Sequence, residues 1–406
     1  MSLEGGATGG STGGSTGGST GGSTGGSTGG STGGPTLGDV YATPLFAEAL
    51  NRHRGAAIDL AETEPLWGMS LRTDPSDHSH LFRWEPWVRS YVAVHELLRP
   101  MDFKIETVNG PAGGSGAAAT EHISVALSAT MRDDADEDRS WGLVRLINPA
   151  PEVFEGQLTK VLEWAELRED RMAEILAQID NQHSLWGTIV PIQSDRMRHT
   201  RELLEVALQL SVFVEMRFKH ELACWRPADY SAQVQPMITT PGHGSLPSGH
   251  CTQSYVTCEV FKALLNTMQR GARFQSINTQ FHRMAERIST NRVVAGLHFP
   301  VDNVAGRVLG TVLGKYFVHR CGHRPTGGGK DTKTWYAAEF DGRRFKGSDE
   351  FHPSAQRLFA DDPGEKVPFY AVRVQKRDLS RQRQASVLAE LWDRARAECK
   401  LLGLMF

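Results

Sequence analysis

The side chains best suited to chemistry in this 406-residue chain fall in three short segments, and the first segment pairs a lysine with an arginine. Lys219 and Arg226 are seven residues apart, so a helix through this stretch would place both cations on one face. Pro227 follows directly and would end that helix. Taken alone, two cations at this spacing are typical of a solvated helix surface, so they gain meaning only from the other two segments.

The second segment is Pro247-Ser248-Gly249-His250, which leads directly into a helical pattern. A glycine lets the backbone approach a ligand closely, and the free N–H groups at a helix start favour an anion. Taken alone, the segment could equally be a plain turn and helix cap.

The third segment holds Arg292, then His298 after five residues, then Asp302 after three more. Residues four apart can place a carboxylate beside an imidazole and fix its tautomer, although a structural histidine is the simpler interpretation of this pair alone. Together the segments supply three cations, two histidines, a carboxylate and a Ser-Gly turn within 84 residues. That set suits a pocket for a tetrahedral oxyanion, with a nucleophile or ligand and an acid–base partner.

The three-part pattern Lys-x6-Arg-Pro, Pro-Ser-Gly-His and Arg-x5-His-x3-Asp resembles the superfamily of vanadium-dependent haloperoxidases and type 2 phosphatidic acid phosphatases. The resemblance covers residues 219–302 directly. One departure is Asn291, where the family usually has serine before the arginine. The resemblance implies a haloperoxidase-like helical bundle. Together with the patterns on either side of it, we expect a mainly α protein with a partly β N-terminal elaboration and a small C-terminal extension.

The resemblance also implies which groups bind the anion. Lys219, Arg226 and Arg292 would neutralise the equatorial oxygens of phosphate or vanadate. Ser248 and the Gly249 N–H would donate further hydrogen bonds.

The catalytic roles implied by the resemblance fall to three residues. His298 would be the nucleophile towards phosphorus or the metal ligand, as the single protein ligand to vanadium. His250 would be the general acid–base group on the opposite side, and Asp302 would orient His298. Because vanadate mimics the transition state of phosphoryl transfer, the motif identifies the anion and leaves the reaction open.

Two further residues bear on which reaction the site performs. Trp225 directly precedes Arg226, as in haloperoxidases, although a tryptophan there could also pack in the core. His243 lies five residues before Ser248, where the resemblance implies histidine in bromide-oxidising members and phenylalanine in chloride-oxidising ones. The alternative for His243 is a loop histidine without a role.

Three functions therefore stay open. The favoured one is a vanadium-dependent haloperoxidase with vanadate as cofactor, which oxidises a halide, bromide by the His243 criterion, with hydrogen peroxide. The first alternative is a soluble acid phosphatase that hydrolyses a phosphate ester through a phosphohistidine. The second is a non-catalytic oxyanion-binding protein. Cys251 counts slightly against the peroxidase, because a thiol beside His250 would be oxidised unless it is buried.

Apolar periodicity supplies the elements that must position these residues. It predicts helices over 154–180, 199–222, 251–269 and 277–290, and one from Pro300 to about Tyr316. Successive helices favour a bundle core over about 150–320. The alternation of Ile123, Val125, Leu127 and Ala129 predicts a half-buried strand. Phe369–Val374 could form another strand, and Asp378 or Ser380 could cap a last helix.

The chain divides into three parts. Residues 9–32 are six copies of Gly-Gly-Ser-Thr, so residues 1–36 are expected to be a flexible tether. A haloperoxidase-like helical domain is expected over 37–325 and a C-terminal extension over 326–406.

Composition excludes several classes of protein. With 44 basic and 47 acidic residues there is no excess of positive charge for a nucleic-acid backbone. No run of about 18 apolar residues predicts a membrane span, and the N-terminus does not resemble a signal peptide. Five cysteines without Cys-x-x-Cys spacing favour reduced thiols, hence a cytoplasmic location. Helical members of this family often pair, so a homodimer is a reasonable expectation.

Overall fold

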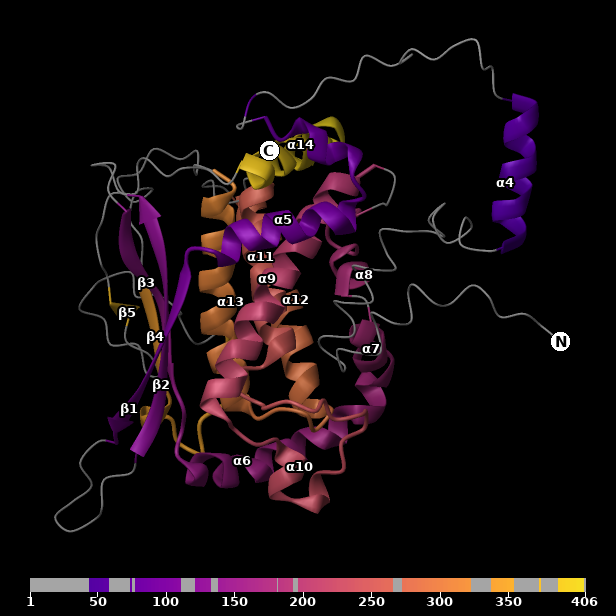
Figure 1. The fold of residues 1–406 in the computed structure, drawn as a ribbon. Coiled ribbons are helices and arrows are strands. Elements are labelled where there is room, and N and C mark those ends of the chain that lie inside the picture. Colours follow the sequence, from indigo (N-terminus) through magenta and orange to yellow (C-terminus); the bar gives the residue numbers. More distant parts are fainter. Residues whose placement is uncertain are drawn as a thin grey trace.

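The computed structural model describes most of the chain after the predicted tether. The described residues are 44–57, 74, 77–110, 121–132, 138–180, 182–192, 196–265, 272–322, 337–353, 372–373 and 386–404. Residues 1–36 lie outside them, as do the expected cap residues Asp378 and Ser380. The fold is mainly helical with one small sheet, which confirms the predicted fold class (Figure 1).

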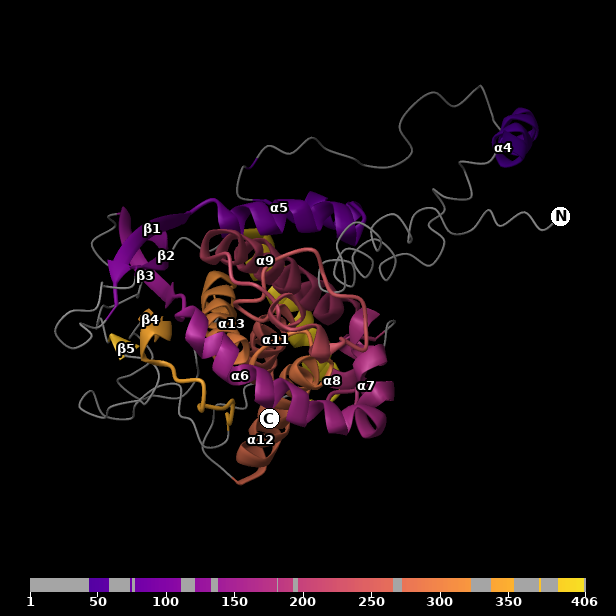
Figure 2. The same cartoon turned by 90° about the horizontal axis from the view of Figure 1, so that it is seen from below.

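Four helices form the bundle that carries the three segments. They are α9 (Arg198–Leu222), α11 (Gly249–Leu264), α12 (Ala272–Val294) and α13 (Pro300–Arg320). Helix α11 packs against each of the other three, and Figure 2 shows the bundle from its end. Every residue of α11 except Lys262 is buried. The predicted bundle over about 150–320 is therefore present, with α11 as its central helix.

Glycines on α13 bring it unusually close to α11. Gly306, Gly310 and Gly314 recur every four residues, and all three face α11. A Cβ atom on Gly310 would lie 2.3 Å from the carbonyl oxygen of Thr252, closer than any real contact. The close approach brings the starts of the two helices together, because the Ser248 N–H donates to the carbonyl of Asp302 at 2.9 Å.

Helices from both ends of the chain cover α9. They are α5 (Pro86–Leu98) and α14 (Ser386–Leu401). Arg89 of α5 forms a buried two-point ion pair with Glu202 of α9. Glu398 of α14 accepts hydrogen bonds from the N–H groups of His199 and Thr200, both at 2.9 Å, and so caps the start of α9. The expected C-terminal extension therefore contributes a helix that packs on the bundle.

A five-stranded sheet lies beside the bundle in the order β1-β2-β3-β4-β5. Its strands are β1 (Met101–Asn109), β2 (Glu121–Arg132), β3 (Asp138–Ile147), β4 (Ala337–Asp341) and β5 (Val372–Arg373). Neighbours are antiparallel, except β3 and β4, which are parallel. The sheet packs on α9 and α13, with the Phe103 and Phe218 rings 5.6 Å apart. The strand predicted around Val125 is confirmed as part of β2.

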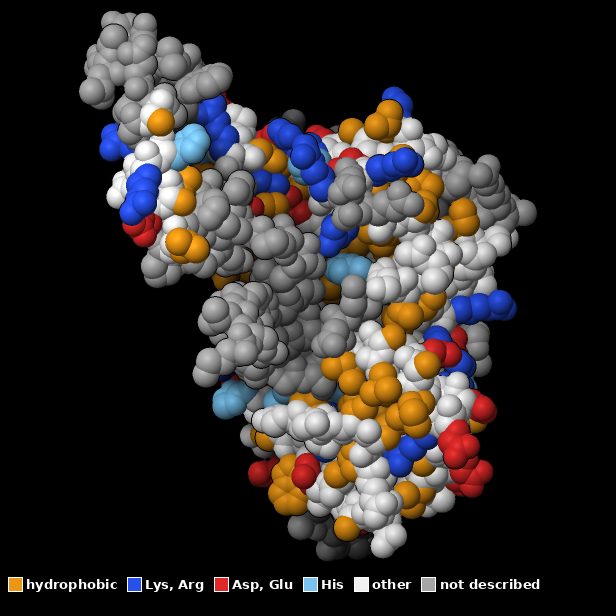
Figure 3. All heavy atoms as spheres, turned by 90° about the vertical axis from the view of Figure 1, so that its right-hand side faces the viewer, with side chains coloured by type: hydrophobic (Ala, Val, Ile, Leu, Met, Phe, Trp, Pro, Cys, Tyr) orange, Lys and Arg blue, Asp and Glu red, His pale blue; other side chains and the backbone are white. Residues whose placement is uncertain are grey.

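The segment predicted as one helix over 154–180 is instead two helices, α6 (Pro151–Trp164) and α7 (Arg168–Asp180). A 3-10 turn at Ala165–Leu167 separates them, so the three- and four-residue periodicity continues through a change of axis. Met172 and Leu176 of α7 are about half exposed, and apolar side chains gather on the side of the molecule to which α7 contributes (Figure 3).

Shorter elements complete the described part. They are α4 (Pro44–Ala57), η1 (Ser79–Arg83), α8 (Gln182–Trp186), α10 (Pro227–Tyr230), η3 (Ala232–Val234) and η5 (Gly342–Arg344). None of the helices in the described ranges has the length and apolar character that crossing a membrane requires.

Candidate oxyanion site

Lys219 and Arg226 reach the site from two different elements. Helix α9 ends at Leu222, because Ala223 adopts a left-handed conformation (φ 49°) and its N–H bonds the carbonyl of Lys219 at 3.1 Å. Arg226 follows this turn and precedes α10, where the Asp229 carboxylate accepts from the Arg226 N–H at 2.9 Å. The prediction that both cations share one helix face is therefore wrong, yet both side chains are buried in the same region.

Lys219 holds the loop that precedes Ser248. Its Nζ donates to the carbonyl oxygens of Gly244 at 3.0 Å, Ser245 at 3.1 Å and Pro247 at 2.6 Å. Burial and the nearby Arg226 guanidinium lower the pKa of Lys219. The three donated bonds nevertheless require the protonated amine, so the lysine brings positive charge to the site, and a direct bond to an anion would require it to give up one carbonyl.

Arg226 connects the loop at His243 with the segment at His298. Its Nε donates to the His243 carbonyl and its Nη1 to the Leu297 carbonyl, both at 2.9 Å. Nη1 also lies 3.4 Å from Nε2 of His298, and Nη2 lies 3.2 Å from Nδ1 of His243. Since a guanidinium can only donate, it faces the unprotonated Nε2 of a neutral His298.

The five-residue spacing between Arg292 and His298 is the end of a helix. Gly296 adopts a φ of +79°, its N–H bonds the Val293 carbonyl at 2.9 Å, and the Leu297 N–H bonds the Arg292 carbonyl at 3.0 Å. These two bonds form the Schellman arrangement that closes α12. The chain leaves this turn with His298 directly before the next helix.

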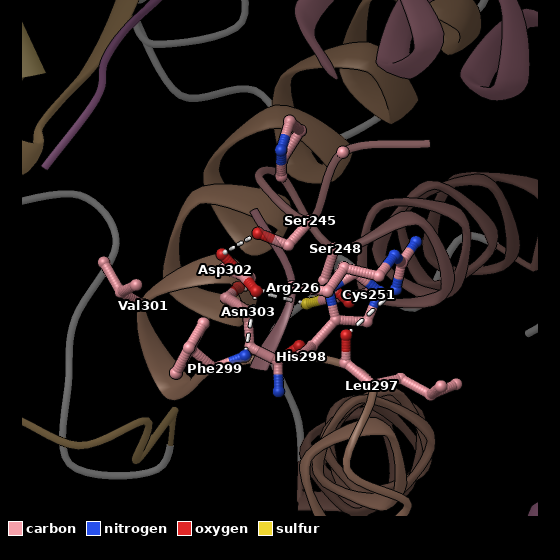
Figure 4. A network of polar contacts seen from close by, with 12 residues as sticks. Arg226, Ser245, Ser248, Cys251, Leu297, His298, Phe299, Val301, Asp302 and Asn303 are labelled. Atoms are coloured by element: carbon pink, nitrogen blue, oxygen red, sulfur yellow. Dashed lines mark hydrogen bonds and ion pairs between the residues drawn. The ribbon is translucent and has the colours of Figure 1, made fainter. Parts of the chain in front are cut away.

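The three-residue spacing between His298 and Asp302 is the start of a helix. Pro300 occupies the first turn of α13, and the Asp302 carboxylate accepts from the Phe299 N–H at 2.8 Å. The same carboxylate lies 3.2 Å from Nδ1 of His298 and 3.4 Å from Oγ of Ser245 (Figure 4). Asp302 therefore caps the helix and fixes the His298 tautomer with one side chain.

His298 is held in its neutral form. Burial and the positive charges of Arg226 and Lys219 keep its pKa well below the usual value. With Nδ1–H directed at Asp302, the lone pair of Nε2 is left on the side of the cations. A neutral imidazole with a free Nε2 is what a nucleophile or a metal ligand requires.

Ser248 and His250 stand at the start of α11. The Ser248 hydroxyl is buried and has no hydrogen-bond partner among the described residues. Nε2 of His250 donates to the carbonyl of Gln178 at 3.0 Å, which leaves its Nδ1 unprotonated and, in the described part of the chain, without a partner. Burial and Arg292 keep the pKa of His250 well below its usual value.

Arg292 is fully buried, and only one of its three guanidinium nitrogens donates a hydrogen bond within the described part of the chain. Its Nη2 donates to Oε1 of Gln178 at 2.7 Å and to the Ile175 carbonyl at 3.2 Å. Its Nε and Nη1 find no partner among the described residues. Leaving a buried donor unpaired costs about 1–3 kcal/mol, so donors of this kind collected in one place indicate a ligand. Two guanidinium nitrogens, a hydroxyl and an imidazole suit the oxygens of phosphate or vanadate.

A comparison with known protein families agrees with the oxyanion site that the geometry indicates. Residues 203–324 match the PAP2 superfamily. The matched span runs from α9 to the end of α13 and contains every predicted site residue from Lys219 to Asp302. No curated protein matches the chain. The match supports a phosphatase- or haloperoxidase-like protein and does not separate the two activities.

Within the PAP2-like region, Trp225 and His243 differ in their surroundings. Trp225 is 64% exposed, so it does not pack in the core, and its nearest described ring is Tyr230 at 6.2 Å. His243 is brought to the site by its contacts with Arg226. Burial and the two cations lower the pKa of His243 to about 3, so its imidazole is neutral.

Three residues that support the site are not predicted from the sequence. Ser245 donates to the Trp225 carbonyl at 2.7 Å and also faces Asp302. Glu215 is buried one turn before Lys219 on α9, where it accepts from Gln253 at 3.2 Å. Gln178 contacts both His250 and Arg292 from α7, outside the matched region. No motif marks these residues, because each acts through a contact made between elements distant in sequence.

Proposed function

We propose that this chain is a vanadium-dependent haloperoxidase-like enzyme, which oxidises a halide with hydrogen peroxide at a vanadate held by His298. The observation that carries the proposal is the neutral His298, whose Nε2 lies 3.4 Å from Arg226 beside buried donors without partners. A tetrahedral oxyanion with one histidine ligand would satisfy those donors together.

The residues would divide the binding between them. His298 would supply the single nitrogen ligand, and Asp302 would keep that nitrogen unprotonated. Nε and Nη1 of Arg292, with the Ser248 hydroxyl and the Gly249 N–H, would hold the oxygens, while Lys219 and Arg226 would compensate their charge. Bound vanadate acts as a Lewis acid that activates peroxide towards halide.

His250 would move the proton. Because its Nε2–H is bonded to the Gln178 carbonyl, Nδ1 is the nitrogen that can accept a proton from hydrogen peroxide. The same nitrogen would then return the proton to the departing oxygen, as a general acid. Nδ1 of His250 would thus both accept and donate the proton.

One observation favours halide oxidation over phosphate transfer, and a second removes an objection to it. His243 contacts Arg226 and is neutral, so it offers an imidazole beside the anion site, where the resemblance expects one in bromide-oxidising enzymes. Cys251 is fully buried, and its thiol donates to the Asn303 carbonyl at 3.1 Å. Burial raises the pKa of Cys251 to about 12, so the reactive thiolate is suppressed beside an oxidant.

The test is bromination of a phenolic dye by purified protein supplied with orthovanadate, hydrogen peroxide and bromide. Wild type should brominate the dye, and His298→Ala should reduce the rate by at least about 100-fold. His220→Ala is the matched control, because His220 lies on α9 with an exposed side chain and should leave the rate unchanged. Folded wild type that stays inactive from mildly acidic to mildly basic pH would contradict the proposal.

A phosphatase is the second candidate, and the PAP2 match supports it as much as a haloperoxidase. The same Nε2 of His298 would attack phosphorus, and His250 would protonate the leaving group before the phosphohistidine is hydrolysed. Hydrolysis of p-nitrophenyl phosphate that vanadate inhibits and His298→Ala abolishes would support it. Vanadate binding without turnover of either substrate would instead indicate a non-catalytic oxyanion-binding protein.

A further inference from the structure

Gln178 lies outside the PAP2-like region and contacts two residues of the candidate site, His250 and Arg292. It lies in the last turn of α7, where carbonyl groups have no partner within the helix. Its backbone carbonyl accepts from Nε2 of His250 at 3.0 Å, and its side-chain oxygen accepts from Nη2 of Arg292 at 2.7 Å. The Gln178 side chain is almost fully buried, so solvent does not compete for these bonds.

Arg292 keeps its full charge in this arrangement. Within the described ranges it forms no ion pair with a carboxylate, and both groups that accept from it, Gln178 and the Ile175 carbonyl, are neutral. Burial lowers the pKa of Arg292 to about 9, with no carboxylate to raise it again. A buried cation without a counter-ion is costly unless a ligand brings the missing negative charge.

Helix α7 does carry a carboxylate nearby, but it is used elsewhere. Glu174 is one turn before Gln178, and it pairs with Arg287 at 2.7 Å and accepts from Asn291 at 3.0 Å. The helix therefore presents its acid to the half-exposed Arg287 and its neutral amide to the buried Arg292. The amide at position 178 gives Arg292 a fixed acceptor without neutralising it.

We infer that Gln178 is a positioning residue that orients Arg292 without cancelling its charge, so that the site selects tetrahedral oxyanions with two negative charges over those with one. The inference rests on the proposed oxyanion site and applies to vanadate and to phosphate monoesters alike. A carboxylate in place of this amide would form an ion pair with Arg292 and remove the charge that a dianion needs.

The experiment is calorimetric binding of sulfate and perchlorate at one pH, since both anions are tetrahedral and they differ in charge. Wild type should bind sulfate more tightly than perchlorate. Gln178→Glu, which has nearly the same shape, should weaken sulfate binding at least about tenfold and perchlorate binding only about threefold, because the Coulomb energy scales with ligand charge. The matched control is Gln182→Glu. Gln182 is a buried glutamine four residues further along the chain, at the start of α8, where it donates to Gln253, so this variant should retain most of the sulfate affinity.

A neutral variant separates orientation from charge. Gln178→Met keeps the length of the side chain but removes its acceptor, so both anions should bind more weakly. Unchanged binding in Gln178→Met would refute the orienting role, whether or not Gln178→Glu folds. Equal losses of sulfate and perchlorate in Gln178→Glu, or an equal loss of sulfate in Gln182→Glu, would refute the charge selection. Wild type that binds neither anion would refute the oxyanion site itself.

Discussion

Asp302 shows how one side chain serves both the fold and the chemistry. Its carboxylate caps α13 through the Phe299 N–H and lies 3.2 Å from Nδ1 of His298. The sequence spacing predicts the His298–Asp302 contact, because residues four apart are neighbours at a helix start. It does not predict Ser245 as a third partner, since that bond spans 57 residues of chain.

Asp302 and Asp229 give a matched test at the residue scale, because each caps a helix that begins with proline. Asp302→Asn should weaken orthovanadate binding by about 10- to 100-fold, because the charged partner that orients His298, the proposed vanadium ligand, is lost. Asp229→Asn makes the same change of charge at the equivalent cap beside Arg226 but touches no histidine, so its affinity should stay close to wild type. Titration of each variant with vanadate measures the difference. Equal affinities in the two variants would show that Asp302 acts only as a cap.

The positions at which helices begin and end determine where the side chains of the candidate site lie. Helix α9 ends through the left-handed Ala223, α12 through Gly296, and α11 and α13 begin at Gly249 and Pro300. Sequence patterns predict the helices themselves well, because the apolar periodicity is local. They do not predict the turn at Ala223, since alanine is an uncommon residue in a left-handed conformation and carries no signal for it.

The close packing of α11 on α13 gives a prediction at the element scale. Gly310→Ala should lower the free energy of unfolding by about 1–3 kcal/mol or more, because the new methyl group would meet the Thr252 carbonyl. It should also weaken phosphate binding, since Ser248 and Asp302 lie at the joined starts of these helices. Gly242→Ala is the control, because a Cβ there meets nothing within 4 Å. Urea unfolding of both variants measures the effect, and equal midpoints would contradict it.

At the scale of the whole molecule, segments near the C-terminus pack against elements about 200 residues earlier in the chain. Strand β4 pairs with β3 about 190 residues away, and Glu398 caps α9 about 200 residues away. Neither contact could be predicted, because a five-residue strand and a single glutamate carry no pattern that names a distant partner. The predicted strand at Phe369–Val374 contains the two described residues of β5, which join the same sheet, and its other residues lie outside the described part of the chain.

Neutral histidines with buried ring nitrogens make the stability of the folded protein depend on pH in the acidic range. Burial lowers the pKa of His183 to about 4, and in the described part of the chain neither ring nitrogen has a partner. The folded state therefore binds fewer protons than the unfolded state between about pH 6.5 and 4. Stability is full above this window and falls as the pH drops through it, by about 1.4 kcal/mol per pH unit for one such group.

Replacing that histidine tests the effect. His183→Leu should lose about 2 kcal/mol less stability than wild type between pH 7 and pH 5, because its side chain cannot take up a proton. His220→Leu replaces an exposed histidine and should follow the wild-type curve. Urea unfolding at pH 7 and pH 5 measures the free energy of unfolding of each variant. Because only the difference between the two pH values is compared, any constant effect of leucine on stability cancels. Parallel curves for wild type and His183→Leu would contradict the expected protonation.

The most direct test of the oxyanion site is a crystal structure of the wild-type protein grown with orthovanadate. We expect vanadium bonded to Nε2 of His298, with its oxygens on the Arg292 guanidinium and the Ser248 hydroxyl, whose donors are otherwise unpaired among the described residues. Well-ordered crystals with saturating vanadate that leave His298 without the anion, or bind it elsewhere, would contradict the proposed site.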